Sequence, residues 1–210
     1  MRLLKDRIEP GVRVLFVGIN PGIRSAAIGH HFAGYSNRFW KLLYESRLVP
    51  EPIGSEDDGR LTEWDFGITN LVPRPTPGID TLHPQEFVDG LRVLRRKVRR
   101  WRPQVVALVG VTLARAIFER RPADRIALGL QPDTFEGARV FVLPNPSGRN
   151  ANFSYQEMLA AFKGLKRLVR GVRLWPDLTR LAASAPARAA LDACRTSTRQ
   201  PAGSSMPPAA

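Results

Sequence analysis

Four short apolar runs, with helical patterns between them, constrain the fold of this 210-residue chain more than any other feature. The runs are rich in Val, Ile, Leu and Phe, which is typical of strands that helices cover on both faces. Because a helical segment follows each run, right-handed crossovers should join neighbouring strands in parallel. We therefore expect an α/β protein, a three-layer α/β/α sandwich with a central, mostly parallel four-stranded sheet. The expected strands are 12–19, 67–72, 104–109 and 140–143.

The segments between the apolar runs show the sequence features of helices, which are capping residues at the start and apolar residues at helical spacing along one face. The longest has apolar residues at helical spacing on one face and many Arg and Lys residues on the other, which is most simply a face in contact with solvent. In the last segment, Ser154 is followed three residues later by Glu157, the signature of a capping box at a helix start. Helices are expected over 37–47, 84–101 and 112–120 and from about 154, and loops over 50–65 and 121–138.

Length and composition divide the chain into a domain and a tail. With 210 residues, of which 43% are hydrophobic, the chain is long enough for one α/β domain with a sizeable core. Beyond Trp175-Pro176 the composition shifts to Ala, Pro, Ser, Arg and Thr, which bury too little apolar surface to offset the entropy of ordering. We expect a folded domain over 1–176 and a largely disordered tail over 177–210.

Charge and cysteine content narrow the class of protein. Lys and Arg total 32 against 19 Asp and Glu, a formal charge of +13, and such a field attracts nucleic acid by counterion release. A single cysteine, Cys194, excludes a disulfide, a thiolate zinc site and an iron–sulfur cluster within one chain. No apolar stretch reaches the roughly 20 residues that span a bilayer, and the N-terminus lacks the apolar segment of a signal peptide. We expect a soluble, cytoplasmic protein that associates with the nucleoid.

Two turns of similar composition mark one edge of the expected sheet. Asn20-Pro21-Gly22 follows the first strand, and Asn145-Pro146-Ser147-Gly148 follows the last. Asn, Pro, Ser and Gly are the residues that commonly form turns, so either turn alone is most simply a structural feature without a role in binding. Because parallel strands end at the same edge, however, the two turns should face each other across one crevice, where α/β proteins bind their ligands.

The amide of Asn20 limits the chemistry available at this edge. An amide has no useful proton affinity, so Asn20 cannot act as a general base, but it can accept a hydrogen bond from water or donate one to an anion. Such positioning suffices only where the leaving group departs largely on its own and water captures the resulting cation. Dissociative hydrolysis of an N-glycosidic bond is a reaction of this kind.

Phe32 and two histidines lie in a Gly-flanked stretch after the first turn. The ring in Gly29-His30-His31-Phe32-Ala33-Gly34 can lie flat against a planar base, although core packing is the more common role of a Phe. His30 and His31 are most simply turn residues or phosphate contacts, since the sequence around them offers no acidic or Cys partner for a metal. We assign them no catalytic proton transfer.

Several sequence blocks follow one another in a fixed order along the chain. They are Gly18-Ile19-Asn20-Pro21-Gly22, Gly29-His30-His31-Phe32, Asn37-Arg38-Phe39-Trp40-Lys41, Gly67-Ile68-Thr69-Asn70-Leu71-Val72, Arg74-Pro75-Thr76 and Asn145-Pro146-Ser147-Gly148. In these blocks the chain resembles the mismatch-specific uracil/thymine DNA glycosylases, a family within the uracil-DNA glycosylase superfamily. The resemblance covers about residues 8 to 170, and several ordered blocks are far more specific than one pentapeptide. It implies a monofunctional glycosylase that needs no metal or cofactor and leaves an abasic site.

The resemblance also implies roles for individual residues. In that family the Asn of the first motif positions the attacking water, which falls on Asn20, and the aromatic residue that stacks on the extruded base falls on Phe32. The last motif supplies a loop that enters the duplex, with Arg149 as the inserted residue. Faster uracil glycosylases have an acidic residue and a His where this chain has Asn20 and Asn145. The implied substrate-binding residues are Gly22, Ser25, His31, Phe32, Asn70, Thr76 and Asn145, and the implied DNA-binding residues are Ser147, Gly148, Arg149 and Asn150.

The resemblance implies a monomer that binds double-stranded DNA with a mispaired uracil or thymine. Three alternative functions stay open. A sibling branch of the superfamily would change the lesion but not the reaction. A non-catalytic nucleic-acid-binding module would use the turns as phosphate nests. A hydrolase of free nucleosides would act without a duplex and would have no use for the strongly basic field. Uracil release from a G·U duplex, compared between the native chain and Asn20→Ala, separates these classes.

Overall fold

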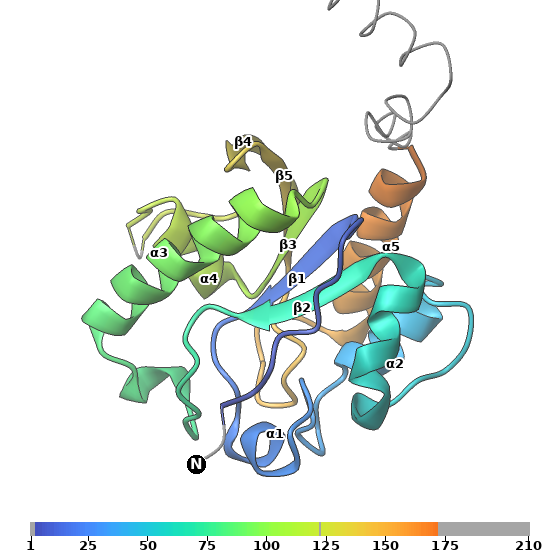
Figure 1. Cartoon of the computed structure of the whole chain (residues 1–210), viewed down its shortest axis with the longest axis horizontal. Coiled ribbons are helices and arrows are strands. Elements are labelled where there is room, and N and C mark those ends of the chain that lie inside the picture. The colour runs from blue at the N-terminus through green and yellow to red at the C-terminus, as the bar shows by residue number, and fades with distance from the viewer. Residues whose placement is uncertain (1–2, 122, 172–210) are drawn as a thin grey trace, which may run out of the picture. The chain divides into compact units, whose positions relative to one another are not determined.

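The computed structural model describes residues 3–121 and 123–171, which form a five-stranded sheet between two layers of helices (Figure 1). The strand order is β2-β1-β3-β5-β4. The pairings β2-β1, β1-β3 and β3-β5 are parallel, and β4 is antiparallel to β5. The strands are β1 Val14–Gly18, β2 Phe66–Asn70, β3 Val105–Val109, β4 Gly129–Phe135 and β5 Ala138–Leu143.

The α/β class and the mostly parallel sheet are confirmed, but the expected count of four strands is wrong. The additional strand, β4, lies in the segment 121–138 that the sequence pattern assigns to a loop. It is an edge strand, it is mostly exposed, and it contains Pro132, so it lacks the apolar run by which buried strands are recognised. A two-residue turn with positive φ at both Glu136 (50°) and Gly137 (82°) closes the hairpin between β4 and β5.

Both outer edges of the sheet are interrupted or covered. On the β4 side, the pairing with β5 is irregular between Leu130 and Thr134, the part of the strand that contains Pro132. On the β2 side, the N-terminal segment forms an isolated antiparallel bridge. In this bridge, Arg7 N donates to Ile68 O at 3.0 Å and Ile68 N donates to Arg7 O at 2.8 Å.

Alternate residues of the central strands face different helix layers. Val14 and Phe16 of β1 pack in one core with α2 and α5, whereas Leu15 and Val17 pack in a second core with α3 and α4. All four side chains are fully buried. A strand with this pattern is apolar throughout, which is why the sequence predicts it well. The helices are α2 Phe39–Glu45, α3 Pro84–Trp101, α4 Val111–Ile117 and α5 Tyr155–Gly171.

The four predicted helices are confirmed, and capping residues explain their ends. Before α5, Ser154 N donates to the Glu157 carboxylate at 2.7 Å, as expected for a capping box. Helix α3 begins with a proline, which suits the first turn, and it ends at Arg102, whose φ of 47° lies in the left-handed region. Three further short helices carry no clear sequence signal. They are α1 Ile23–Ile28 and the 3₁₀ helices η1 Ser55–Trp64 and η2 Ile79–Thr81. The helix η1 occupies most of the segment 50–65, where the sequence pattern predicts a loop.

The predicted tail over 177–210 and its boundary at residue 176 lie outside the described residues. Among residues 3–121 and 123–171, no helix combines the length and the apolar content needed to cross a bilayer. Within the same residues, no three His, Cys, Asp or Glu side chains converge as they would around a metal ion.

Candidate active site

The carboxyl edge of the sheet brings the two predicted turns together. Because β3 lies between β1 and β5 and all three are parallel, the loops that follow them leave from the same edge. Gly110, directly after β3, separates the turns: a Cβ at this position would lie 3.7 Å from Asn145 Cβ and 4.0 Å from Ile19 Cδ1. Asn20 and Asn145 therefore lie on the same edge, two strand spacings or about 10 Å apart.

A cavity of about 220 Å³ lies between the loops after β1, β3 and β5. Ile19 lines it, but Asn20, Phe32 and Asn70 do not. The predicted residues therefore form two neighbouring groups on one edge of the sheet. Asn145, Ser147, Arg149 and Asn150 line the cavity. Beside the end of β1, Asn20 contacts Thr76, and Asn70 contacts His31 and lies with Phe32 next to Gly18.

The Asn20 amide has one orientation that satisfies its surroundings. Its Nδ2 donates to Thr76 Oγ1 at 2.7 Å, to Pro21 O at 3.1 Å and to Arg74 O at 3.4 Å. The Thr76 hydroxyl itself donates to Gly78 O at 2.6 Å. Because carbonyl oxygens only accept, the amide nitrogen must face them. Within the described residues no group donates to Asn20 Oδ1, so this oxygen is left to accept a hydrogen bond from a water or a ligand.

Asn70 and His31 form a second oriented pair. His31 is only 1% exposed, and its Nε2 lies 3.0 Å from Lys5 O, so Nε2 carries the hydrogen. His31 Nδ1 is then an acceptor, and it lies 3.4 Å from Asn70 Nδ2. On the other side of the amide, a Cβ on Gly18 would lie 2.6 Å from Asn70 Oδ1. Glycine at position 18 therefore leaves room for the Asn70 amide at the end of β1.

The Phe32 ring lies beside this amide in a fixed position. Phe32 has φ of 51°, in the left-handed region that residues other than Gly rarely adopt. Phe39 stacks on the ring, with centroids 4.2 Å apart and an angle of 23° between the planes. A Cβ on Gly18 would also lie 3.3 Å from Phe32 Cζ. The ring is partly buried, and it borders the same space as Asn70.

Asp58 anchors the loop that carries Phe32, and the sequence analysis misses this residue. Its side chain is 1% exposed, and its Oδ1 accepts a hydrogen bond from Arg7 Nε at 3.0 Å and lies 3.2 Å from His30 Nδ1. Its Oδ2 accepts a hydrogen bond from His31 N at 3.0 Å. Asp58 lies in η1, in a polar segment, and no sequence signal separates this carboxylate from the other acidic residues of that helix.

Two further predicted residues lie at the start of this loop. Gly22 is exposed and precedes α1. Ser25 is buried, and its Oγ accepts a hydrogen bond from Ala33 N at 3.0 Å. The Ser25 hydroxyl therefore supports the backbone next to Phe32.

Side chains of the last loop fix the backbone of that loop. Asn145 Oδ1 accepts a hydrogen bond from Ser147 N at 3.0 Å, and Asn150 Nδ2 donates to Asn145 O at 2.7 Å. Asn145 therefore uses its amide oxygen in a local turn, and its amide nitrogen is the group that can still donate to a ligand.

Gly148 and Arg149 connect the last loop to its neighbours. A Cβ on Gly148 would lie 2.8 Å from Ser36 O, so the loop packs closely against the segment before α2. Arg149 is exposed, and its guanidinium donates to Pro77 O at 3.1 Å. This contact joins the last loop to the loop after β2, which also holds Thr76, a partner of Asn20.

Burial of His31 makes the stability of this site depend on pH. The pKa of His31 is lowered, mainly because burial disfavours the charged ring. The hydrogen bond to Lys5 O and the carboxylates of Asp58 and Asp6 oppose this shift, whereas the charge of Arg7 adds a small effect in the same direction. The unfolded chain therefore binds a proton at a higher pH than the folded chain. His31 therefore does not reduce the free energy of unfolding above a pH of about 6.5, the pKa in the unfolded chain. Below that pH, the free energy of unfolding decreases by at most about 1.4 kcal/mol per pH unit.

We expect urea unfolding at pH 7.5 and pH 5.5 to show this loss in the native chain and a smaller loss in His31→Gln, because Gln does not take up a proton in this range. Equal losses in the two proteins would show that the decrease comes from other groups.

The comparisons with known proteins agree with this architecture. The solution NMR structure of "a putative Uracil DNA glycosylase from Methanosarcina acetivorans" is similar to this chain with a TM-score of 0.58 and 16% sequence identity, over 80% of this chain and 98% of that chain. At this identity the likeness shows a shared fold. The model of the Uracil DNA glycosylase superfamily matches residues 6–166, which include every predicted site residue. Because the match covers most of the sequence, the chain belongs to the uracil DNA glycosylase superfamily.

Proposed function

We propose that this protein is a monofunctional DNA glycosylase that removes uracil from G·U mispairs, and thymine from G·T mispairs more slowly, and leaves an abasic site. Membership of the superfamily supports excision of uracil from DNA. The sequence blocks shared with mismatch-specific enzymes support the preference for mispairs. The observation that carries the mechanism is the Asn20 amide, whose nitrogen is bound within the protein while its oxygen is not.

In the proposed reaction, the nucleotide leaves the duplex before the chemical step. Extrusion costs a few kcal/mol and costs least where the base is mispaired, which favours mispaired substrates. The bond between the sugar and uracil then breaks, and its electron pair leaves with the base. Asn20 Oδ1 accepts a hydrogen bond from a water below the sugar, and this water adds to the cationic sugar carbon and releases a proton to solvent.

We propose that the extruded base lies against Phe32 and is recognised by Asn70. Neutral His31 accepts a hydrogen bond from Asn70 Nδ2, so the amide presents its oxygen and its second N–H in a fixed direction. An acceptor and a donor side by side match the imide edge of uracil. Backbone N–H groups near Gly22 and Phe32 would stabilise the departing anion. The buried Ser25 side chain, with Ala26 and His31, is proposed to limit the space for the methyl group of thymine.

Arg149 is proposed to fill the space that the extruded nucleotide leaves in the duplex. Its hydrogen bond to Pro77 O would then be exchanged for contacts in the base stack. We expect Arg149→Ala to lower single-turnover excision from a G·U duplex about tenfold, and excision from a single strand less than about twofold, because a single strand has no gap to fill. Arg96→Ala, which removes an exposed Arg on α3, is the control. Equal losses on both substrates would contradict this role.

The proposed function is tested by incubating the full chain with labelled duplexes that contain G·U, A·U or G·T and then cleaving abasic sites with alkali. We expect release from G·U to be fastest and release from G·T to be about 10- to 200-fold slower, the range that one methyl group accounts for. Binding to all three duplexes without release of any base would support a non-catalytic nucleic-acid-binding module. Release from free nucleosides at the same rate would support a nucleoside hydrolase.

A further inference from the structure

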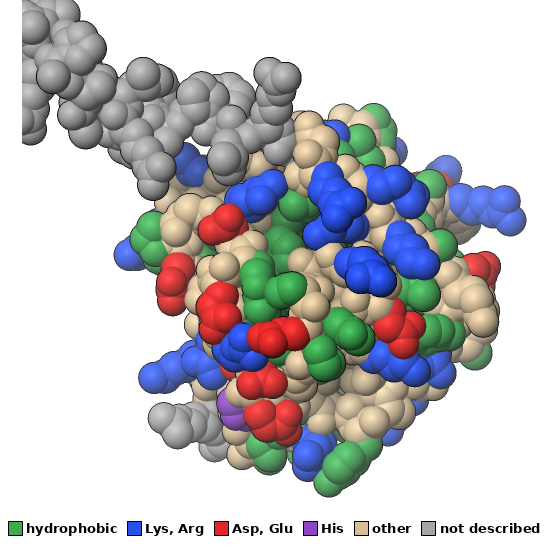
Figure 2. Space-filling model, turned by 90° about the vertical axis from the view of Figure 1, so that its right-hand side faces the viewer, with side chains coloured by type: hydrophobic (Ala, Val, Ile, Leu, Met, Phe, Trp, Pro, Cys, Tyr) green, Lys and Arg blue, Asp and Glu red, His purple; other side chains and the backbone are tan. Residues whose placement is uncertain are grey.

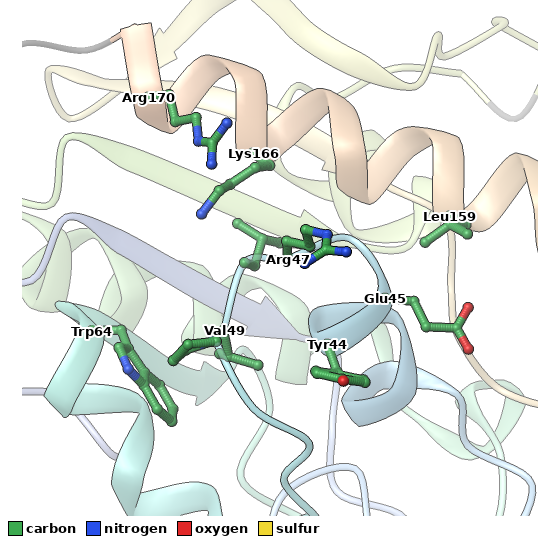
Figure 3. Close-up of a pocket in the computed structure, with 10 residues that line it drawn as sticks. Tyr44, Glu45, Arg47, Val49, Trp64, Leu159, Lys166 and Arg170 are labelled. Atoms are coloured by element: carbon green, nitrogen blue, oxygen red, sulfur yellow. The ribbon is translucent and has the colours of Figure 1, made fainter.

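A second cavity, of about 770 Å³, lies between α2, the loop after α2 and α5, and we call it the amino-edge groove (Figure 3). Arg13, directly before β1, donates to Val169 O near the end of α5 at 2.9 Å, so this end of α5 lies at the amino edge of the sheet. Lys166, which lines the groove, is three turns or about 16 Å along α5 from its start at Tyr155. The cationic part of the groove is therefore remote from the catalytic edge.

Three cations gather in the amino-edge groove. Lys166 and Arg170 extend from one side of α5, and Arg47 lies on the loop facing that side (Figure 3). No carboxylate within residues 3–121 and 123–171 forms an ion pair with any of the three. The pKa of Lys166 is lowered because its ammonium is partly desolvated and because Arg170 and Arg13 repel its charge. The groove thus holds positive charge that the described part of the protein does not neutralise.

The acidic residue of the groove does not neutralise these cations. Glu45 lies at the other end of the groove, and its carboxylate is directed away from the three cations (Figure 3). It accepts a hydrogen bond from Tyr155 Oη at 2.8 Å and lies 3.7 Å from Lys41 Nζ. On the face shown in Figure 2, Lys and Arg side chains gather in the upper part, and further Lys and Arg stand among the Asp and Glu side chains below.

The cations of α3 differ from those of the groove. Arg95 and Arg99 both pair with Glu136, at 2.6 and 3.5 Å, and Lys97 pairs with Asp6 at 2.7 Å. Arg92 pairs with Asp89 at 3.3 Å, so four of the six cations on the basic face of α3 form ion pairs within the protein. The groove on α5 is therefore a better candidate for an anionic ligand than the more basic helix.

Two aromatic side chains complete the amino-edge groove. Trp64, at the end of η1, is partly exposed, and the Arg60 guanidinium lies 5.4 Å from its ring centroid. Tyr44 is 41% exposed. Aromatic rings beside a track of cations are the combination by which proteins hold unpaired bases and the phosphates between them. Acidic peptides have no general need for such rings.

We propose that the amino-edge groove binds a short segment of single-stranded nucleic acid, with phosphates on Arg47, Lys166 and Arg170 and unpaired bases against Trp64 and Tyr44. A volume of about 770 Å³ accommodates a few nucleotides. Because Lys166 and Arg170 lie near the end of α5, at the edge of the sheet opposite the catalytic site, binding here should be independent of base excision.

The proposal is tested on the full chain with a fluorescein-labelled oligothymidylate of about twelve nucleotides, by fluorescence anisotropy over a range of salt concentrations. The double variant Lys166→Gln/Arg170→Gln should bind about tenfold more weakly at about 0.15 M salt. The slope of log K against log salt should become shallower by about 1.4, since each phosphate contact on a single strand contributes about 0.7. Uracil release from a G·U duplex should stay within about twofold of the native rate.

Lys163→Gln/Arg167→Gln is the matched control. It changes the same residue types at the same spacing on the same helix, but neither residue lines the groove. We expect a loss of affinity below about threefold. Equal losses in the two double variants would show attraction to a diffuse field on α5 and would overturn the proposal.

A base-free oligonucleotide with the same number of phosphates tests the aromatic part of the groove. Trp64→Leu keeps apolar bulk in the core but removes the flat ring, so it should weaken binding of oligothymidylate about tenfold and leave binding of the base-free strand unchanged. Equal effects on both strands would contradict a role in stacking. Polyglutamate and thymidine monophosphate are tested as competitors at the same total charge as unlabelled oligothymidylate. If either competes as strongly as the oligonucleotide, the groove binds a different ligand and the proposal is overturned.

Discussion

Asn20→Ala should lower the single-turnover rate of uracil release from a G·U duplex by about 10²- to 10³-fold, while duplex binding stays within about threefold. In the proposed mechanism the Asn20 oxygen holds the attacking water below the sugar, and removal of one such preorganised group costs catalysis by about this factor. The rate is measured by quench-flow with the enzyme in excess, and binding by anisotropy with a non-cleavable analogue. Gln85→Ala, an exposed amide on α3, should leave both quantities unchanged.

Asn20→Asp separates positioning by an amide from general-base catalysis. In this variant an oxygen replaces Nδ2 and faces Pro21 O and Arg74 O, which lie 3.1 and 3.4 Å from the native nitrogen. Because these carbonyls cannot donate, the carboxylate is repelled, and we expect a rate at least about tenfold below native at pH 7.5. A variant as active as the native chain would show that the environment of Asn20 tolerates a base, and the proposed orientation would be wrong.

Asp58→Ala should lower the free energy of unfolding by about 2 to 4 kcal/mol. The substitution leaves Arg7 and His31 N without their buried acceptor, and the loss of one partner from a buried charged pair costs about 3 to 5 kcal/mol. The expected value is lower because Arg7 is 30% exposed and can reach water. Urea unfolding monitored by circular dichroism measures the change. The loop with Phe32 should loosen as well, so excision should fall about tenfold at a temperature where the variant is folded.

Glu56→Ala is the control for this effect, because Glu56 lies in the same helix but is exposed. We expect it to change stability by less than about 0.5 kcal/mol. Asp58→Asn keeps the shape of the side chain and should fall between the two. If Asp58→Ala unfolds at the same urea concentration as the native chain, the buried carboxylate does not anchor the loop.

The sequence predicts a strand or helix where the apolar residues of that segment are also the ones that are buried in the fold. Strand β1 is buried on both faces and reads as an unbroken apolar run, and helix α3 has a proline at its start and an apolar stripe, so its predicted and observed bounds are both 84–101. Strand β4 has neither pattern, because it is an exposed edge strand with an internal proline. It is recognisable only through its pairing with β5.

For the candidate site, the sequence predicts at which edge of the sheet the residues lie, but not the direction in which their side chains are held. That Asn20 and Asn145 share one edge follows from parallel strands alone. The direction of the Asn20 amide depends on Arg74 O and Thr76 Oγ1, which are 54 and 56 positions away in the sequence. The buried role of Asp58 and the amino-edge groove likewise arise from segments that meet only in the folded chain, and no local pattern marks either of them.

The two outer strands of the sheet also bear on self-association. A second copy of the chain could lengthen the sheet only along a straight border with regularly spaced backbone donors and acceptors. Pro132 lacks a donor and lies where the β4 pairing is irregular, and Arg7 already occupies Ile68 on the opposite border. Growth of the sheet into a filament by strand pairing is therefore obstructed in both directions, and copies of the chain crowded together have no open border at which to extend it.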